Sequence, residues 1–217
     1  MQEDNYYFNY KDINLYFKKG ESISILGSNN DEIVSFLLSK NIHVITYKSL
    51  YEFNKKTVKE EISMYYDKNI DELLSEYNLS NKNISELNIC ERIKLKILIS
   101  ILSEETIIID NILSLLDDND YKLILKKLNE YNKNEKIVIN ITNNIEETIF
   151  GNRLIIIYDD KLLCNDYTLI ALREEKLLKR IGLGLPFIVE LNKYLMDYGL
   201  INKYYLTTTG LVNELWK

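Results

Sequence analysis

Residues Glu21–Ser35 read ESISILGSNNDEIVS, an apolar strand that ends at Gly27 and runs into a helix. This is the frame of a P-loop, G-x-x-x-x-G-K-[ST], in which backbone N–H groups and a lysine contact phosphate and a hydroxyl holds Mg²⁺. Five residues after Gly27 the chain has Glu32 instead of glycine, followed by Ile33 and Val34. The frame of the motif is present, and its phosphate-binding residues are absent.

The composition is that of a soluble globular protein of 217 residues, with 46% hydrophobic and 28% charged residues. The net charge is −6 and the charges are interspersed, so no basic field indicates nucleic-acid binding. No apolar run approaches the ~20 residues of a membrane-spanning helix, and the polar start MQEDNYY predicts that there is no signal peptide. Cys90 and Cys164 lack metal-ligand spacing, so we expect two reduced core thiols in a cytosolic protein.

Short β-branched runs predict four buried strands, at Ile23–Leu26, Ile107–Ile109, Ile137–Ile141 and Leu154–Tyr158. Helical patterns lie between them, at Asp31–Lys40, Tyr121–Asn132 and the turn around Glu146–Phe150. Strands that alternate with helices predict an α/β protein with a largely parallel sheet and helices on both faces.

Two further regions have helical periodicity without strands. The first, about 57–103, predicts an inserted helical subdomain. In the second, Ala171–Ile181 predicts an amphipathic helix, and Pro186 opens another that ends at Gly199. We therefore expect a core over 1–168 and a C-terminal helical extension over 169–217.

The order of these elements resembles the ATP-binding cassette (ABC) ATPases, specifically the ATPase subunits of energy-coupling factor transporters, which have a P-loop NTPase-like fold. The likeness covers nearly the whole chain. Its segments are YKDINLYFKKGESISILGSNN before and at the P-loop, IHVITYKSLYEFNKKTVKEEIS at the Q-loop and coupling surface, SELNICERIKLKILISIL at the signature, TIIIDNILSLLDD at Walker B and the D-loop, and VINITNN at the switch histidine. The tail, LLKRIGLGLPFIVELNKYLMDYGL followed by LTTTGLVNELWK, resembles the family's C-terminal extension.

The chain departs from the family at most nucleotide-site positions. The nucleotide-binding remnant consists of Gly27, Asn29, Asn30, Glu32, Ile33, Val34 and Ser35. Asn111 stands at the catalytic glutamate, Asn143 at the switch histidine and Tyr47 at the Q-loop glutamine, so no catalytic residue is expected. The signature Ser-Gly-Gly-Gln reads Asn88, Ile89, Cys90 and Glu91, whereas Asp110 of Walker B and the D-loop pair Ser114 and Asp117 persist. The short link from Ser35 to Tyr47 predicts a trimmed antiparallel subdomain.

These departures predict a pseudo-ATPase. Loss of a lysine–phosphate contact costs roughly 4 kcal/mol at about 4 Å, which is about three decades of affinity. Stacking of adenine on Tyr10 or Tyr7 would contribute only about 1–3 kcal/mol. The amide of Asn111 cannot accept a proton as a general base does. We expect no cofactor, where the resemblance alone would imply Mg-ATP.

Several of these residues also have purely structural interpretations. Asp110 is either a magnesium ligand or a hydrogen-bond acceptor at a strand end, and Ser114 and Asp117 either form an interface or shape a turn. The lone His43 is expected to pack or face solvent. The aromatic residues Tyr47, Tyr51 and Phe53 are either semi-buried or the surface that receives a membrane partner. The residues Leu185, Pro186, Phe187 and Leu191 dimerise the family's tail, pack it on the core, or do both.

The resemblance implies three partners: a second ABC ATPase subunit, a transmembrane coupling subunit and a substrate-specificity protein. It places the chain, through these partners, on the cytoplasmic face of the cell membrane. Three functions remain open at this stage. The chain is a non-catalytic importer subunit, an ATPase completed by a lysine or arginine of its partner, or a free-standing regulatory module.

Overall fold

The computed structural model describes residues 6–216. The first five residues of MQEDNYY, the start that predicts no signal peptide, lie outside the described residues. Its main sheet has five strands in the order β4-β5-β3-β6-β7. The strands are β3 (Ser22–Gly27), β4 (Thr106–Asp110), β5 (Ile137–Thr142), β6 (Arg153–Tyr158) and β7 (Lys161–Tyr167). Only β7 is antiparallel to its neighbour. The predicted α/β fold with a largely parallel sheet is confirmed.

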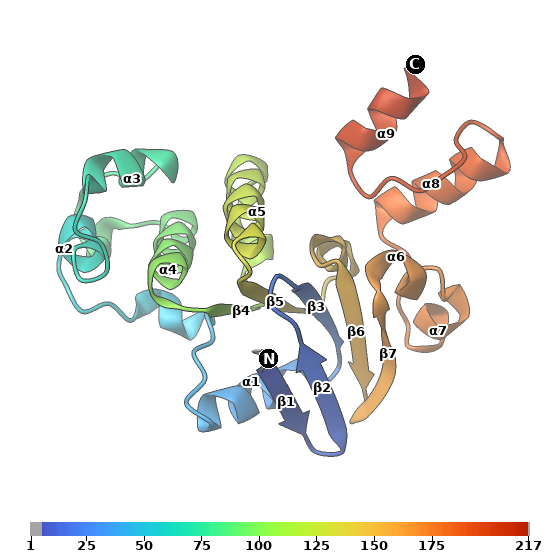
Figure 1. Ribbon diagram of the computed structural model, residues 1–217, viewed down its shortest axis with the longest axis horizontal. Helices are drawn as coiled ribbons and strands as arrows, with labels where there is room; N and C mark the ends of the chain where they lie inside the picture. Colours follow the sequence, from blue (N-terminus) through green and yellow to red (C-terminus); the bar gives the residue numbers. More distant parts are fainter. Residues whose placement is uncertain (1–5, 217) are drawn as a thin grey trace.

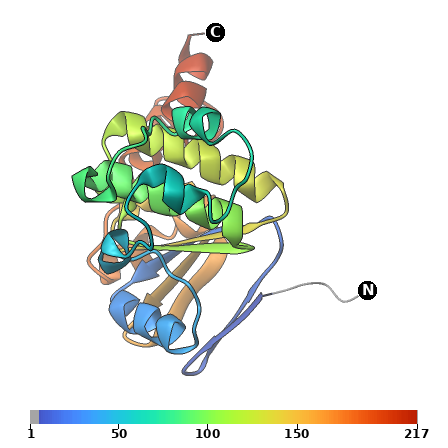
Figure 2. The ribbon, with the colours of Figure 1, turned by 90° about the vertical axis from the view of Figure 1, so that its left-hand side faces the viewer.

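Both faces of this sheet are covered, as Figures 1 and 2 show. One face packs against α1 (Asn30–Ser39) and a separate hairpin of β1 (Tyr6–Tyr10) and β2 (Ile13–Phe17). The other face packs against α4 (Ile89–Ser103), α5 (Asp118–Lys133) and the C-terminal helices. Because side chains alternate along a strand, Ile108 of β4 faces α1, whereas Ile107 and Ile109 belong to the cluster around α4.

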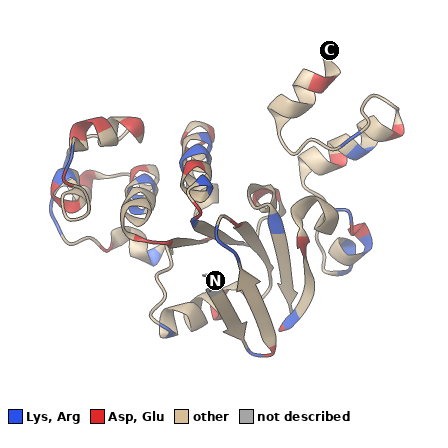
Figure 3. Ribbon diagram, in the orientation of Figure 1, with Lys and Arg blue, Asp and Glu red and all other residues tan. Residues whose placement is uncertain are grey.

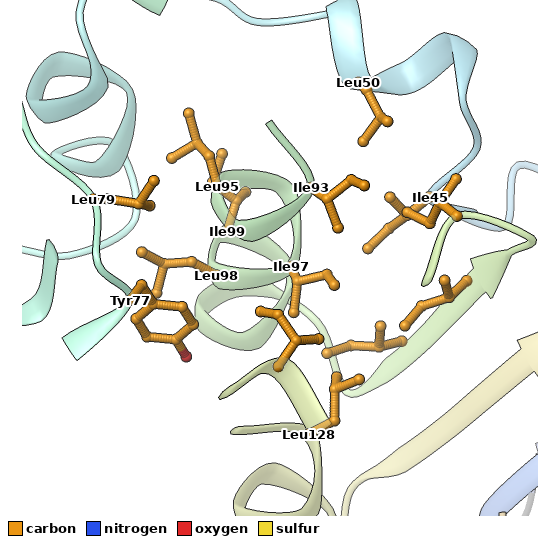
Figure 4. Close-up of a cluster of buried hydrophobic side chains, with 14 of the residues drawn as sticks. Ile45, Leu50, Tyr77, Leu79, Ile93, Leu95, Ile97, Leu98, Ile99 and Leu128 are labelled. Atoms are coloured by element: carbon orange, nitrogen blue, oxygen red, sulfur yellow. The ribbon is translucent and has the colours of Figure 1, made fainter. Parts of the chain in front are cut away.

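The region from β3 to β4 contains several helices and no strand of the main sheet. After α1 it contains η1 (Lys48–Tyr51), α2 (Val58–Ile62), α3 (Ile70–Glu76), η2 (Ile84–Glu86) and α4. Figure 4 shows how Ile93 and Ile97 of α4 face Ile45 and the sheet, while Leu98 of the same helix lies beside Tyr77. All of these side chains are almost wholly buried. This core anchors α4, whose first turn carries the signature position.

The rest of the chain after β7 forms four helices: α6 (Thr168–Ala171), α7 (Glu175–Arg180), α8 (Phe187–Asp197) and α9 (Thr208–Leu215). The prediction of one helix over Ala171–Ile181 is wrong. The helix stops after α6 because the Glu175 N–H donates to the Arg173 carbonyl in a tight turn, and α7 then begins anew. Gly199 ends α8 with a positive φ of 68°, as expected.

Two short helices complete the fold, η3 (Leu113–Leu115) after β4 and η4 (Ile145–Phe150) after β5. Within residues 6–216, no helix is both long and apolar enough to cross a membrane. The division into a core over 1–168 and an extension over 169–217 stays a prediction.

Candidate functional site

The predicted nucleotide-site positions meet at one edge of the main sheet. Gly27 ends β3, Asp110 ends β4 and Asn143 follows β5. These strands are parallel neighbours, so their carboxyl ends share an edge, which is where open α/β sheets bind ligands. The structure thus brings together residues that the sequence separates by up to 116 positions.

The turn from β3 into α1 is short. Only Ser28 and Asn29 separate Gly27 from the first helical residue, and the Ile33 N–H already donates to the Asn29 carbonyl at 2.9 Å. A P-loop instead uses the residues between its glycines as a loop whose N–H groups surround phosphate. Here that segment is a two-residue turn followed by the first turn of α1, so it does not form a loop that surrounds a phosphate.

The two side chains at the lysine and hydroxyl positions face the protein interior. Ile33 is 0% exposed and Val34 6% exposed, and both belong to the cluster under the sheet with Ile25 and Ile141. Ser35, the only hydroxyl nearby in this part of α1, is exposed. The structure therefore places no cation at either position of the motif.

Gly27 has a packing role of its own. A Cβ atom at this position would lie 1.7 Å from the carbonyl oxygen of Ile157 on the adjacent strand β6. Close approach of two strands is therefore sufficient to require glycine here. Retention of this glycine does not by itself indicate phosphate binding.

An ion-pair cluster covers the start of α1. Lys11, in the β1–β2 turn, donates to Glu32 at 2.9 Å and lies 2.6 Å from a carboxylate oxygen of Asp160 in the β6–β7 turn. The Tyr10 hydroxyl donates to the same Glu32 oxygen at 2.8 Å. Hydrogen bonds from Lys11 and Tyr10 lower the pKa of Glu32, and those to Asp160 and Glu32 raise the pKa of Lys11. One cation and two carboxylates of the protein thus pair at this helix terminus, and the cluster keeps a net negative charge.

Of the two tyrosines suggested as a stacking platform, Tyr10 is buried and Tyr7 is exposed. Tyr10 is only 3% exposed and its pKa is raised chiefly by burial, so its ring has no face open to an adenine. Tyr7 is exposed but packs edge-on against Tyr16 with ring centroids 5.3 Å apart.

The turn after β3 is tied to the β6–β7 turn. The Asn29 side-chain amide donates to an Asp160 carboxylate oxygen at 2.9 Å, and the Asp160 N–H donates back to the Asn29 side chain at 3.1 Å. The Asp159 N–H donates to the Ser28 hydroxyl at 3.2 Å. The polar groups of the remnant loop therefore bind neighbouring protein groups.

Three asparagines connect the remaining positions of the site. The buried Asn30 donates to the Asn143 side chain at 2.5 Å, and the Asn143 N–H donates to the Asn111 side chain at 3.5 Å. Asn111 has a positive φ of 48°, which asparagine tolerates better than most residues. The predicted positions of the catalytic glutamate and switch histidine are thus adjacent, and they form a neutral amide chain without a general base.

Asp110 is the one retained ionisable group at this edge. Burial and, to a smaller extent, the nearby charge of Asp31 raise its pKa to about 6. Among residues 6–216 its carboxylate accepts no hydrogen bond, so the structural-acceptor interpretation lacks a donor. A carboxylate with this environment is destabilised in its charged form.

We expect Asp110→Asn to stabilise the protein at pH 7.5 by about 1 kcal/mol, the free-energy equivalent of the pKa shift after discounting for partial exposure. The folded-state pKa of about 6 exceeds the ordinary value of 3.8, so the native state binds the proton more strongly. Stability should therefore fall as pH rises from about 4 to about 6, and this fall should vanish in the variant. Urea unfolding at several pH values measures both effects, with Asp12→Asn as the exposed control. A loss of stability in Asp110→Asn would contradict this interpretation.

The signature position has become a self-capped helix start. Asn88 is the N-cap of α4, and its side chain accepts from the Glu91 N–H while Glu91 accepts from the Asn88 N–H, both at 2.9 Å. Glu91 also pairs with Lys82 at 2.7 Å. This capping box satisfies N–H groups of the first turn. Ile89 and Cys90 add side chains where the family has glycines.

The D-loop pair lies between β4 and α5. Ser114 is exposed in η3, and Asp117 caps α5 by accepting from the N–H groups of Asn119 and Asp120 at 2.9 Å. Ligand atoms of Cys90, Asp117 and Asp120 lie within 4.8 Å of one another. Both carboxylates already have protein partners, since Asp120 pairs with the buried Lys94.

The predicted coupling residues lie around η1. Tyr47 and Tyr51 are 57% and 55% exposed, and their rings pack edge-to-face at 5.7 Å with the hydroxyl oxygens 3.3 Å apart. Phe53 is half-buried beneath the ammonium of Lys96 at 4.3 Å. His43 is exposed.

The four predicted tail residues divide into two groups. Leu185 and Leu191 are half-buried against the apolar cluster of the extension and Pro186 is buried, whereas Phe187 is 68% exposed. The Phe187 N–H donates to Glu146 at 2.8 Å, which fixes the start of α8 against the sheet domain. Only part of the set is therefore free to contact another molecule.

The sequence interpretation missed Lys11 and Asp160. They act on α1 from positions 21 residues before and 128 residues after Glu32, and no short motif joins them. One signal was available: both residues lie in two-residue connections between strands, where polar residues with positive φ are favoured.

Comparison with known proteins gives a consistent result. No family model matches the chain. It is 32% identical over 117 residues to the energy-coupling factor transporter ATP-binding protein EcfA1 of Geobacillus kaustophilus, which is 53% of this chain and 42% of that protein. The match to EcfA1 of Bacillus subtilis is 32% over 114 residues, 52% of this chain and 41% of that protein. The chain resembles the ATP-binding subunits of energy-coupling factor transporters. The matched part is less than half the length of these curated relatives.

Solved structures support the same fold. The cbiO1 protein of Clostridium perfringens, part of the ABC transporter complex cbiONQ, superposes with a TM-score of 0.58 at 16% identity, covering 86% of this chain and 96% of that one. A dimeric ATP-binding cassette bound to ADP and Pi superposes at 0.57 and 16% identity, covering 76% of this chain and 97% of that one. At these identities the likeness shows the ATP-binding cassette fold.

Proposed function

We propose that the chain is a non-catalytic ATP-binding cassette subunit of an energy-coupling factor importer, which joins partner subunits instead of hydrolysing ATP. The observation that carries this proposal is the core position of Ile33. Because this side chain is wholly buried, the position of the phosphate-binding lysine is used for packing. The residues present do not fit Mg-ATP, since the turn is short, Glu32 is already paired and the edge lacks a general base.

The signature position, the other part of a nucleotide site shared between two subunits, has also lost its phosphate-binding residues. In a composite site, the signature of one subunit supplies N–H groups to phosphate on the other, as the resemblance implies. Here Glu91 puts a carboxylate at the start of α4, where it accepts from the backbone. The side chains at the P-loop position and at the signature position therefore form contacts within the protein, which favours a structural role.

The C-terminal extension provides a surface for a second ATPase subunit. Phe187 and Tyr194 lie on α8 and Tyr198 is its C-cap, at spacings of seven and four residues, which places the three on one side of the helix. They are 68%, 54% and 80% exposed, and Leu200 beyond the helix is 59% exposed. Exposed apolar residues that cluster in this way are typical of protein interfaces.

Through these contacts the chain would lie at the cytoplasmic face of the cell membrane, bound to a second ATPase subunit, a transmembrane coupling subunit and, through that subunit, a substrate-specificity protein. No nucleic-acid partner is proposed, since Figure 3 shows acidic and basic residues interspersed over the fold.

Co-expression with the ATPase and transmembrane subunits of an importer from the same organism tests this proposal. We expect a stable complex from the unaltered chain and at least about tenfold weaker capture of the ATPase subunit by Phe187→Glu/Tyr194→Glu, because interface aromatic residues carry much of the binding energy. The control is Leu38→Glu, an exposed leucine on α1. Absence of any complex with the unaltered chain would contradict the proposed function.

A further inference from the structure

The edge of the sheet where a nucleotide would lie is acidic in this chain. Asp31, in the first turn of α1, and Asp110, at the end of β4, each place a carboxylate there. In the ion-pair cluster at the same helix start, the carboxylates of Glu32 and Asp160 outnumber the single cation, Lys11. Sites for nucleotide phosphates instead concentrate cations and free backbone N–H groups. The charge at this edge therefore favours a cation and disfavours a triphosphate.

Asp110 is the carboxylate of this edge that most needs a partner. It is half-buried, and among residues 6–216 it forms neither a hydrogen bond nor an ion pair. The neighbouring charge that acts on it is that of Asp31, which is repulsive. Asp31 also forms no ion pair in the described part of the chain. Because like charges destabilise one another where water is partly excluded, a positive group shared by the two carboxylates would be bound favourably.

A buried amide oxygen at the same edge also lacks a donor. Asn30 is 4% exposed, and its Oδ1 has no hydrogen-bond partner among the described residues. Its Nδ2 donates to Asn143 at 2.5 Å, so the side chain extends from the start of α1 across the edge toward the end of β5. The Asn143 N–H in turn donates to Asn111, the residue after Asp110. Buried acceptors are almost always paired, so this oxygen indicates a donor that comes from outside the chain.

Two kinds of cation bind to acceptors of this type, a metal ion and a basic side chain. A metal ion needs several ligand atoms close together around one centre. Within residues 6–216, three acidic or cysteine side chains with ligand atoms within 4.8 Å of one another occur at Cys90, Asp117 and Asp120, and not at this edge. A guanidinium or ammonium group instead brings several N–H donors on a long side chain and binds well to one or two carboxylates. The arrangement of acceptors therefore favours a basic side chain.

We propose that this edge receives an arginine or lysine side chain of the second ATPase subunit, whose N–H groups donate to the carboxylates of Asp110 and Asp31 and to Asn30 Oδ1. This inference rests on the proposed function and adds to it the chemistry of the partner at this edge. In a composite site the second subunit faces this edge, and its cation takes the place of magnesium and phosphate. Charge-assisted hydrogen bonds of this kind are strong and directional. They would join the two subunits without a nucleotide, a role distinct from completing an ATPase.

The test measures the affinity of the full chain for the purified ATPase subunit of an importer from the same organism, without nucleotide, at several salt concentrations and with or without EDTA. Asp31→Asn/Asp110→Asn should weaken binding by about tenfold or more, and added salt should weaken binding of the unaltered chain. Asp67→Asn/Glu135→Gln makes the same change in net charge at exposed positions between α2 and α3 and before β5, and should leave the affinity within about twofold. Because Asp110→Asn is expected to stabilise the fold, unfolding would not explain a loss of affinity; urea unfolding of each variant checks this.

The outcomes distinguish this inference from the proposed function. If the unaltered chain binds the ATPase subunit and both double variants bind as well as it does, the inference is wrong and the proposed function stands. If both double variants lose affinity equally, the attraction depends on overall charge and this edge is not the site. If EDTA abolishes binding and added Mg²⁺ or Ca²⁺ restores it, the occupant is a metal ion and the basic side chain is wrong. If the unaltered chain binds no ATPase subunit, the proposed function and this inference fail together.

Discussion

Replacing Ile33 with lysine, the residue that a P-loop has at this position, is expected to unfold the protein without restoring nucleotide binding. Ile33 is 0% exposed and packs with Ile25 and Ile141 under the sheet. Burying an unpaired ammonium costs several kcal/mol, a large share of the roughly 5–15 kcal/mol that stabilises a domain. Urea unfolding, with and without Mg-ATP, measures both consequences.

The matched control for this variant is Ser35→Lys, two residues along the same helix at an exposed position. We expect it to change the free energy of unfolding by no more than about 0.5 kcal/mol. An Ile33→Lys protein as stable as this control, and stabilised further by Mg-ATP, would show that the lysine position can reach a bound phosphate. That result would contradict the interpretation of α1 given above.

Gly27→Ala should destabilise the protein by about 3 kcal/mol or more, because overpacking against a strand backbone cannot be relieved by rotating a side chain. The added Cβ would lie 1.7 Å from the Ile157 carbonyl oxygen, so β3 or β6 must shift. Thermal and urea unfolding measure the loss. Gly184→Ala is the matched control, since a Cβ there meets no atom within 4 Å. A loss below about 1 kcal/mol would mean that strand packing does not explain the retained glycine.

The sequence predicts the central strands well because they are buried on both faces. The residues of β5 are all buried, and runs such as Ile137–Ile141 therefore stand out as continuous apolar segments. The edge strand β7 is different: its residues Lys161–Tyr167 are mostly exposed, and no apolar run identifies it. Its position follows from pairing with β6, a tertiary contact that the local pattern does not encode.

The candidate site is predictable in outline and not in detail. Motif order correctly predicts that Asp110 and Asn143 lie near the P-loop remnant, since parallel strands end at one edge. It does not predict that Lys11 pairs with both Glu32 and Asp160, because these contacts join turns far apart in the sequence.

The wrong prediction of one helix in the C-terminal extension also has its cause in tertiary contacts. Helical periodicity over Ala171–Ile181 predicts one helix, yet the buried residues Ala171, Leu172 and Leu178 lie at the end of α6, just after it and in α7. The turn between the two helices keeps all three against the same apolar cluster. We attribute the break between α6 and α7 to packing against strand β6. The local sequence contains no glycine or proline that would predict this break.

Titration of Mg-ATP into the purified, folded chain by isothermal calorimetry tests the central claim most directly. The account predicts no binding heat up to about 1 mM nucleotide, which corresponds to a binding free energy weaker than about −4 kcal/mol. Saturable binding in the micromolar range would contradict it, because the buried Ile33 and the paired Glu32 would then be compatible with a bound triphosphate.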